Sequence, residues 1–102
     1  MNETVTAALN TRMNASVQHV VDELNKPGNH ILKTAFLTFN TLPEVGFMFD
    51  GFEDFLTKKN PPQALATWKR INDEADDIAG GHSGASFGFM CRKAAAILSA
   101  KE

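Results

Sequence analysis

Residues 60–79 read NPPQALATWKRINDEADDIA, and this stretch decides the fold. Asn60-Pro61 pairs a capping residue with a proline, which is typical of the start of a helix. Apolar residues then recur every three or four positions, at Ala64, Leu65, Trp68, Ile71, Ala75 and Ile78. This spacing places them on one side of an α-helix, and Gly80-Gly81 interrupts the pattern. The stretch therefore predicts an amphipathic helix from about Pro61 to Ala79.

Two helices are predicted before it. The first runs from Glu3 to about Asn25 with one apolar side, formed by Val5, Leu9, Met13, Val17, Val20 and Leu24. Pro27-Gly28 ends this helix, because proline disfavours helical geometry at the residue before it. Asn29 is the predicted N-cap of the second helix, which extends to Leu42. Its expected inward residues are Ile31, Leu32, Ala35, Phe36 and Phe39.

Two further segments keep the helical period. One begins at Pro43, and its two glycines predict a bend or a split near Asp50-Gly51. The other runs from about Ser86 to Ala100 and directs Phe87, Met90, Cys91, Ala94, Ile97 and Leu98 inward. No segment alternates polar and apolar residues as a strand does. The sequence therefore predicts one all-α domain over residues 1–102, a compact antiparallel helical bundle of four to five helices.

Composition excludes several classes of function. The 102 residues carry 10 basic and 12 acidic side chains, a net charge of −2, with no dense basic stripe for nucleic acid. No apolar run approaches the roughly 20 residues of a membrane span. The single cysteine, Cys91, offers no intrachain disulfide and no cysteine-pair metal site. We therefore expect a cytoplasmic protein without a cofactor, with Cys91 buried in the core.

The aromatic residues predict a large core. Eight Phe and one Trp are enough to fill much of a bundle interior. Four of them lie too close together in sequence to share one side of a helix: Phe47, Phe49, Phe52 and Phe55. A homodimer or a protein partner would cover those left outside.

Three aspartates lie near the end of the helix predicted from about Pro61 to Ala79. Asp73 lies three residues before Asp76 and four before Asp77, so the three carboxylates share one face. A basic protein partner would fit this face. A divalent cation held with His82 is the alternative, but no EF-hand pattern accompanies the aspartates, and we assign no metal here.

The loop from Gly80 to Ser86 carries the histidine most suited to function. Glycines on both sides keep His82 accessible, and imidazole titrates near neutral pH. Ser83 and Ser86 are candidate N-caps whose neighbouring backbone N–H groups suit an anion. The lysine of a phosphate-binding loop is missing. For His19 and His30 we expect structural or solvent roles.

Two stretches resemble histidine-containing phosphotransfer domains, the helical bundles that relay phosphoryl groups between response-regulator receivers. They are Gly28, Leu32, Phe36, Phe39 and Pro43-Glu44, and the segment Ser83-Gly84-Ala85-Ser86-Phe87-Gly88-Phe89. The resemblance implies an all-α fold, a receiver as partner and His82 as the phosphoryl acceptor. If Gly88 is matched to the glycine of the family's turn, the phosphoryl-acceptor position falls on Ile78 instead of His82.

Two hypotheses for function follow. The first is a cytoplasmic signalling module that resembles a phosphotransfer domain and acts by protein–protein contact. The second is a non-catalytic binding or regulatory protein that docks a partner through its acidic helix end and exposed phenylalanines.

Overall fold

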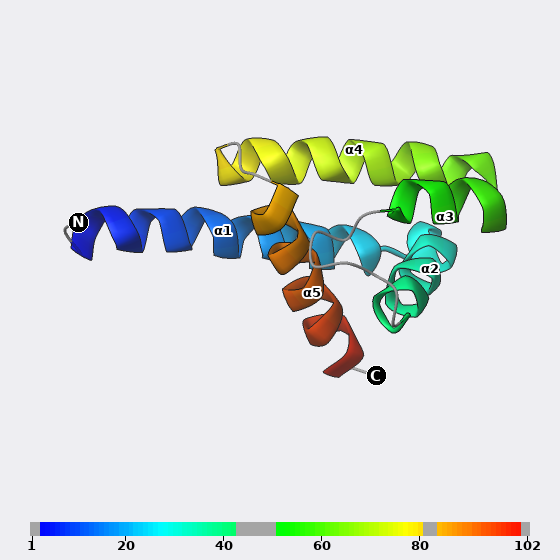
Figure 1. The fold of residues 1–102 in the computed structure, drawn as a ribbon, viewed down its shortest axis with the longest axis horizontal. Helices are drawn as coiled ribbons and strands as arrows, with labels where there is room; N and C mark the ends of the chain where they lie inside the picture. Colours follow the sequence, from blue (N-terminus) through cyan, green and yellow to red (C-terminus); the bar gives the residue numbers. More distant parts are fainter. Residues whose placement is uncertain (1–2, 43–50, 81–83, 101–102) are drawn as a thin grey trace.

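The computed structural model describes the backbone of residues 3–42, 51–80 and 84–100 (Figure 1). Its elements are α1 (Glu3–Leu24), the short 3-10 turn η1 (Pro27–Asn29), α2 (His30–Asn40), α3 (Phe52–Lys59), α4 (Pro62–Ala79) and α5 (Gly84–Ala100). These ranges contain no strand, so the predicted all-α helical bundle is confirmed for them. None of their helices combines the length and apolar character that crossing a membrane requires.

Helix α4 agrees closely with its predicted span, but its N-cap is Pro61 rather than the predicted capping residue Asn60. Pro61 stands in extended geometry as the N-cap, and Pro62 is the first helical residue. The backbone N–H groups at the start of a helix have no partner within it. The missing N–H groups of Pro61 and Pro62 therefore do not lower the stability of the helix. Gly80 ends the helix with a φ of 79°, a left-handed geometry that glycine adopts without strain.

Asn29 is the N-cap residue of α2, as predicted, but its side chain makes no capping hydrogen bond to that helix. Its Nδ2 instead donates to the Glu23 carbonyl oxygen at 2.7 Å. This carbonyl lies in the last turn of α1 and also accepts from the Lys26 N–H at 3.2 Å, so the Asn29 side chain supports the end of α1.

Helix α3 begins at the predicted break, and helix α5 begins earlier than predicted. Gly51 has a φ of 87° and serves as the N-cap of α3, which agrees with the predicted break at this glycine. The predicted helical stretch from Pro43 to Asp50 lies outside the described residues. Helix α5 begins at Gly84, two residues before the predicted start at Ser86.

Helix α1 is the centre of the bundle. It packs mainly against α4 and α5. Figure 1 shows α4 running antiparallel beside α1, while α5 crosses α1 obliquely. Buried residues of α1 include Val20, Val21 and Leu24. The buried Ser16 Oγ donates to the Ala75 carbonyl oxygen at 2.8 Å, which ties α1 to α4 by a hydrogen bond shielded from water.

Aromatic rings join α2, α3 and α4. Ring centroids are 5.0 Å apart for Phe52 and Trp68, 5.5 Å for Phe36 and Trp68, and 5.1 Å for Phe39 and Phe52. All four of these rings are buried, whereas Phe55 is half-buried. The described phenylalanines of α2 and α3 therefore fill the core, and docking through freely exposed rings does not apply to them. Phe47 and Phe49 lie outside the described residues.

Ile31 contradicts its prediction. It was expected on the buried side of α2, yet 55% of it is exposed. The buried side is set by Leu32, Ala35, Phe36 and Phe39, and Ile31 lies about a quarter turn from its centre. Helical spacing alone does not tell a residue inside the core from one at the edge of a groove.

Candidate binding surfaces

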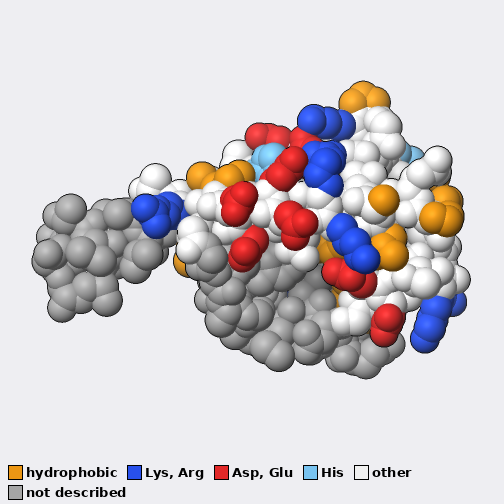
Figure 2. Space-filling view, turned by 90° about the horizontal axis from the view of Figure 1, so that it is seen from above, with side chains coloured by type: hydrophobic (Ala, Val, Ile, Leu, Met, Phe, Trp, Pro, Cys, Tyr) orange, Lys and Arg blue, Asp and Glu red, His pale blue; other side chains and the backbone are white. Residues whose placement is uncertain are grey.

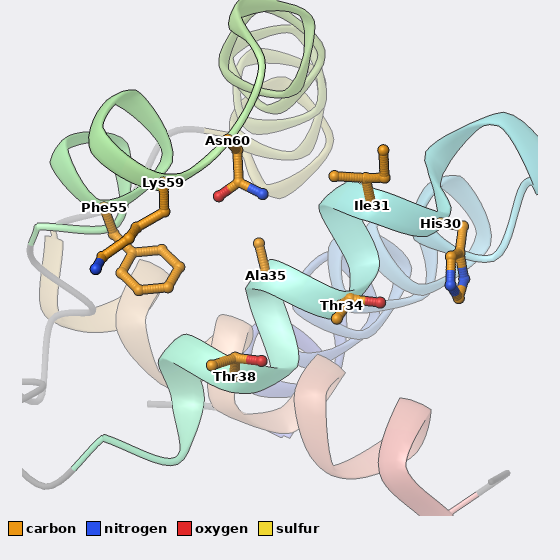
Figure 3. A pocket seen from close by; sticks show the side chains of 8 residues that line it. All are labelled: His30, Ile31, Thr34, Ala35, Thr38, Phe55, Lys59 and Asn60. Atoms are coloured by element: carbon orange, nitrogen blue, oxygen red, sulfur yellow. The ribbon is translucent and has the colours of Figure 1, made fainter.

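A groove lies around Ile31, the only large apolar residue that is exposed in the described part of the chain. On one side is a hollow of about 540 Å³ between α2 and α3 (Figure 3), lined by His30, Ile31, Thr34, Ala35, Thr38, Phe55, Lys59 and Asn60. On the other is a hollow of about 110 Å³ at the starts of α2 and α4, lined by Gly28, Asn29, Ile31, Leu32, Pro61, Gln63, Ala64 and Thr67. We call the two together the Ile31 groove.

The position of α3 explains why the larger hollow exists. Phe39 meets Phe52 and Phe55 with ring centroids 5.1 and 5.3 Å apart, which holds α3 against the carboxyl-terminal half of α2. Helix α3 has only 8 residues, and the chain turns away at Asn60 in extended geometry. Ala35 is buried at the floor of the hollow, whereas Ile31, nearer the start of α2, stays exposed.

The larger hollow has apolar walls and polar ends. Figure 3 shows Ala35, Phe55 and Asn60 pointing toward the same gap, with Lys59 at one end and His30 at the other. The Asn60 Oδ1 is buried and has no hydrogen-bond partner among the described residues. The volume lies within the range of about 300 to 1,000 Å³ that is usual for binding pockets.

The acidic end of α4 is the surface predicted from sequence. Asp73 and Asp77 are exposed and Asp76 is half-buried. Figure 2, which views the molecule from the α4 side, shows acidic side chains gathered over this half of the helix. The described residues with ligand atoms close enough to share an ion are His19, Glu23 and Glu74, and none of the three aspartates belongs to that group. The surface remains a candidate for contact with a basic protein.

Arg12 offsets the unfavourable charge at this helix end. Its Nη1 lies 3.0 Å from the position that a Cβ atom would take at Gly80. The guanidinium therefore stands where the helix dipole is negative and the aspartates gather. Of the other predicted site residues, His82 and Ser83 lie outside the described residues. Ser86 lies in the first turn of α5, but its side chain is not described.

An ion-pair network joins α1 to α4. The His19 Nε2 lies 2.8 Å from the Glu74 Oε1, and the Arg70 Nη1 donates to the same carboxylate at 3.0 Å. Arg70 Nη1 also lies 2.7 Å from the Glu23 Oε1, and Lys26 pairs with the other Glu23 oxygen. Glu23 is only 5% exposed, so this carboxylate is buried between two cations.

These contacts set the charge state of the network. The hydrogen bond from Lys26, followed by that from Arg70, lowers the pKa of Glu23 against the opposing effect of burial. The contact with His19, followed by the bond from Arg70, lowers the pKa of Glu74. His19, Glu23 and Glu74 have ligand atoms within 4.8 Å of one another, but a divalent cation there would meet the charges of Arg70 and Lys26. The geometry fits a brace between helices better than a metal centre.

Sequence reasoning missed this network for an identifiable reason. Its short-range pairs are visible in sequence, since Lys26 follows Glu23 by three residues and Glu74 follows Arg70 by four. The pairs between α1 and α4 join residues about 50 positions apart, and no local pattern reports them. His19 was expected to be structural, and its contact with Glu74 agrees with that.

Cys91 behaves as predicted from its place on α5. Its side chain is fully buried, and burial raises the pKa of the thiol well above its usual value. A protonated, inaccessible thiol is a packing residue rather than a nucleophile.

Comparison with known protein families, with characterised proteins and with solved structures gives no match to this chain. The assignment of function therefore rests on the surfaces described above.

Proposed function

We propose that this protein is a non-catalytic interaction module that binds a protein partner through the Ile31 groove. One observation carries the proposal: Ile31 is 55% exposed and separates two hollows, one of about 540 Å³. Burying a large apolar side chain completely gains about 1.5 to 3 kcal/mol, so a partner that covers Ile31 recovers free energy that folding alone leaves unused.

The character of the groove supports binding rather than chemistry. Its walls are apolar or threonine, while Lys59 and His30 stand at its ends. Apolar walls with a few polar groups at the edge are typical of surfaces that hold and orient a partner. We place the module in the cytoplasm, because its one cysteine is buried as a free thiol.

Selection from a displayed library of helical peptides tests the proposal with the full chain as bait. Selected peptides are measured against Ile31→Ser and against Ala66→Ser, a matched control at another exposed helical position. We expect about a tenfold loss of affinity for Ile31→Ser and little change for Ala66→Ser, as apolar contact with Ile31 is lost. Failure to recover any peptide that depends on Ile31 would refute the proposal.

Phosphotransfer through His82 is a second candidate, supported by the resemblance and by one structural observation. The Arg12 guanidinium lies beside Gly80, two residues before His82 in sequence. A phosphorylated histidine benefits from such a cation, because it offsets the phosphate charge. The helical bundle formed by the described residues agrees with the all-α fold that the resemblance implies.

Transfer of label from a phosphorylated receiver tests this candidate. The expected label is acid-labile and base-stable. It disappears in His82→Gln and persists in His30→Gln, a control at an exposed histidine on α2. Persistence of the label in His82→Gln would remove His82 from the role.

A further inference from the structure

We infer that the occupant of the Ile31 groove is an amphipathic helix of a partner protein. It inserts an aromatic side chain against Phe55 and carries an acidic side chain one helical turn away. This inference rests on the proposed function and specifies the chemistry of the partner. Its three parts come from the walls, the charge and the half-buried ring of Phe55 in the larger hollow.

The walls favour a helix over an extended peptide. The larger hollow lies between α2 and α3, where main-chain hydrogen bonds are already made within each helix. An extended peptide would bury its own N–H and C=O groups against Ile31, Ala35 and Phe55 without partners. A helix satisfies these groups internally and presents only side chains to the groove.

The charge of the lining favours an acidic partner. None of the described residues that line the two hollows carries a carboxylate. Lys59 stands at one end of the larger hollow and makes no ion pair within the described residues, and His30 stands at the other end. A carboxylate on the partner would meet Lys59 at the rim, whereas a basic side chain would meet repulsion there.

Phe55 defines the aromatic anchor. Its ring is half-buried and lines the larger hollow, with the Asn60 side chain beside it (Figure 3). An aromatic side chain of the partner would pack against this ring and remove its remaining exposed surface from water.

The peptides selected with the full chain test the inference. Among those that depend on Ile31, we expect an aromatic residue with Asp or Glu three or four positions away. Lys59→Glu is expected to weaken them about tenfold. Lys58→Glu is the matched control, since Lys58 is exposed on the same turn but does not line the hollow. It should leave the affinity within about twofold, because exposed pairs outside the contact are worth little.

A reciprocal exchange completes the test. Replacing the acidic residue of a selected peptide with lysine should reverse its preference, so that it binds Lys59→Glu more tightly than the wild-type chain. Thermal melts of each variant confirm that the bundle is folded. Peptides that depend on Ile31 but have no acidic preference, or that ignore Lys59→Glu, would overturn the inference and leave the proposed function standing. Absence of Ile31-dependent peptides would overturn both.

Discussion

Removal of the Arg70 guanidinium should destabilise the fold because it leaves a buried carboxylate with less compensation. Arg70 reaches Glu23 at 2.7 Å and Glu74 at 3.0 Å, and Glu23 is 5% exposed. Arg70→Met keeps much of the aliphatic length of the side chain and removes the charge. The variant therefore isolates the electrostatic part of the contact between α1 and α4.

The expected cost lies between two limits. Breaking a fully buried pair costs about 3 to 5 kcal/mol, whereas an exposed pair is worth about 0 to 1 kcal/mol. The Arg70 side chain is 49% exposed and Glu23 keeps Lys26, so the structure places this pair between the limits. We expect a loss of about 2 kcal/mol in the free energy of unfolding at pH 7.

Urea unfolding followed by circular dichroism measures this loss. With a slope of about 1 to 2 kcal/mol per molar urea for a chain of this size, the midpoint should fall by about 1 to 2 M. Lys69→Met is the control, because Lys69 is exposed on the same helix and takes no part in the network. It should change the midpoint little.

The stability that Arg70 contributes should depend on pH. The folded-state pKa of Glu23 lies below its ordinary value of 4.5, so its ion pairs stabilise the protein above about pH 4.5. This stability is lost as the pH falls through the folded-state pKa, where the carboxylate is protonated. The difference between wild type and Arg70→Met should therefore shrink toward zero in acid. Equal urea midpoints for Arg70→Met and Lys69→Met at pH 7 would show that the Arg70 ion pairs do not stabilise the fold.

Three further predictions concern the core and the backbone. Phe36→Ala should lower the free energy of unfolding by about 3 to 5 kcal/mol in urea titrations, because Phe36 is fully buried against Trp68 and Phe52; a loss under about 1 kcal/mol would contradict its place in the core. Gly80→Ala should lower the free energy of unfolding by about 1 kcal/mol or more, because the φ of Gly80 is 79° and the new Cβ would lie 3.0 Å from Arg12. Gly28→Ala is the control: Gly28 has open space around it, so this change should alter the melting temperature little. Cys91 should resist a thiol reagent at pH 8 in the native protein and react once urea unfolds it; rapid labelling of the native protein would contradict its burial.

Local patterns predicted the helices well where capping and period agreed. The span of α4 follows from Pro61 at its start, Gly80 at its end and the apolar spacing between them. Asn29 shows the limit of such reasoning: a capping residue between two helices suits either one, and here it bonds to the Glu23 carbonyl behind it. The choice depends on the path of η1, which local sequence does not fix.

The candidate sites were harder to predict than the helices. The face with Asp73, Asp76 and Asp77 follows from spacing within one helix, and the structure has it on the surface. The Ile31 groove depends on where the short helix α3 lies and where it stops. The rings of Phe39, Phe52 and Phe55 hold α3 against α2, and the chain leaves the helix at Asn60 in extended geometry. Contacts between helices create the groove, so a reading of α2 alone placed Ile31 in the core.

The location of partner contacts on the surface tests most directly whether the Ile31 groove is the binding site. The measurement is a backbone ¹⁵N–¹H shift map of the full chain, titrated with an Ile31-dependent peptide. We expect the perturbed amides to cluster at residues 30–38 and 55–60, the two walls of the larger hollow. Perturbations that cluster instead over Asp73–Asp77 on α4 would contradict it and assign the binding surface to the acidic helix end.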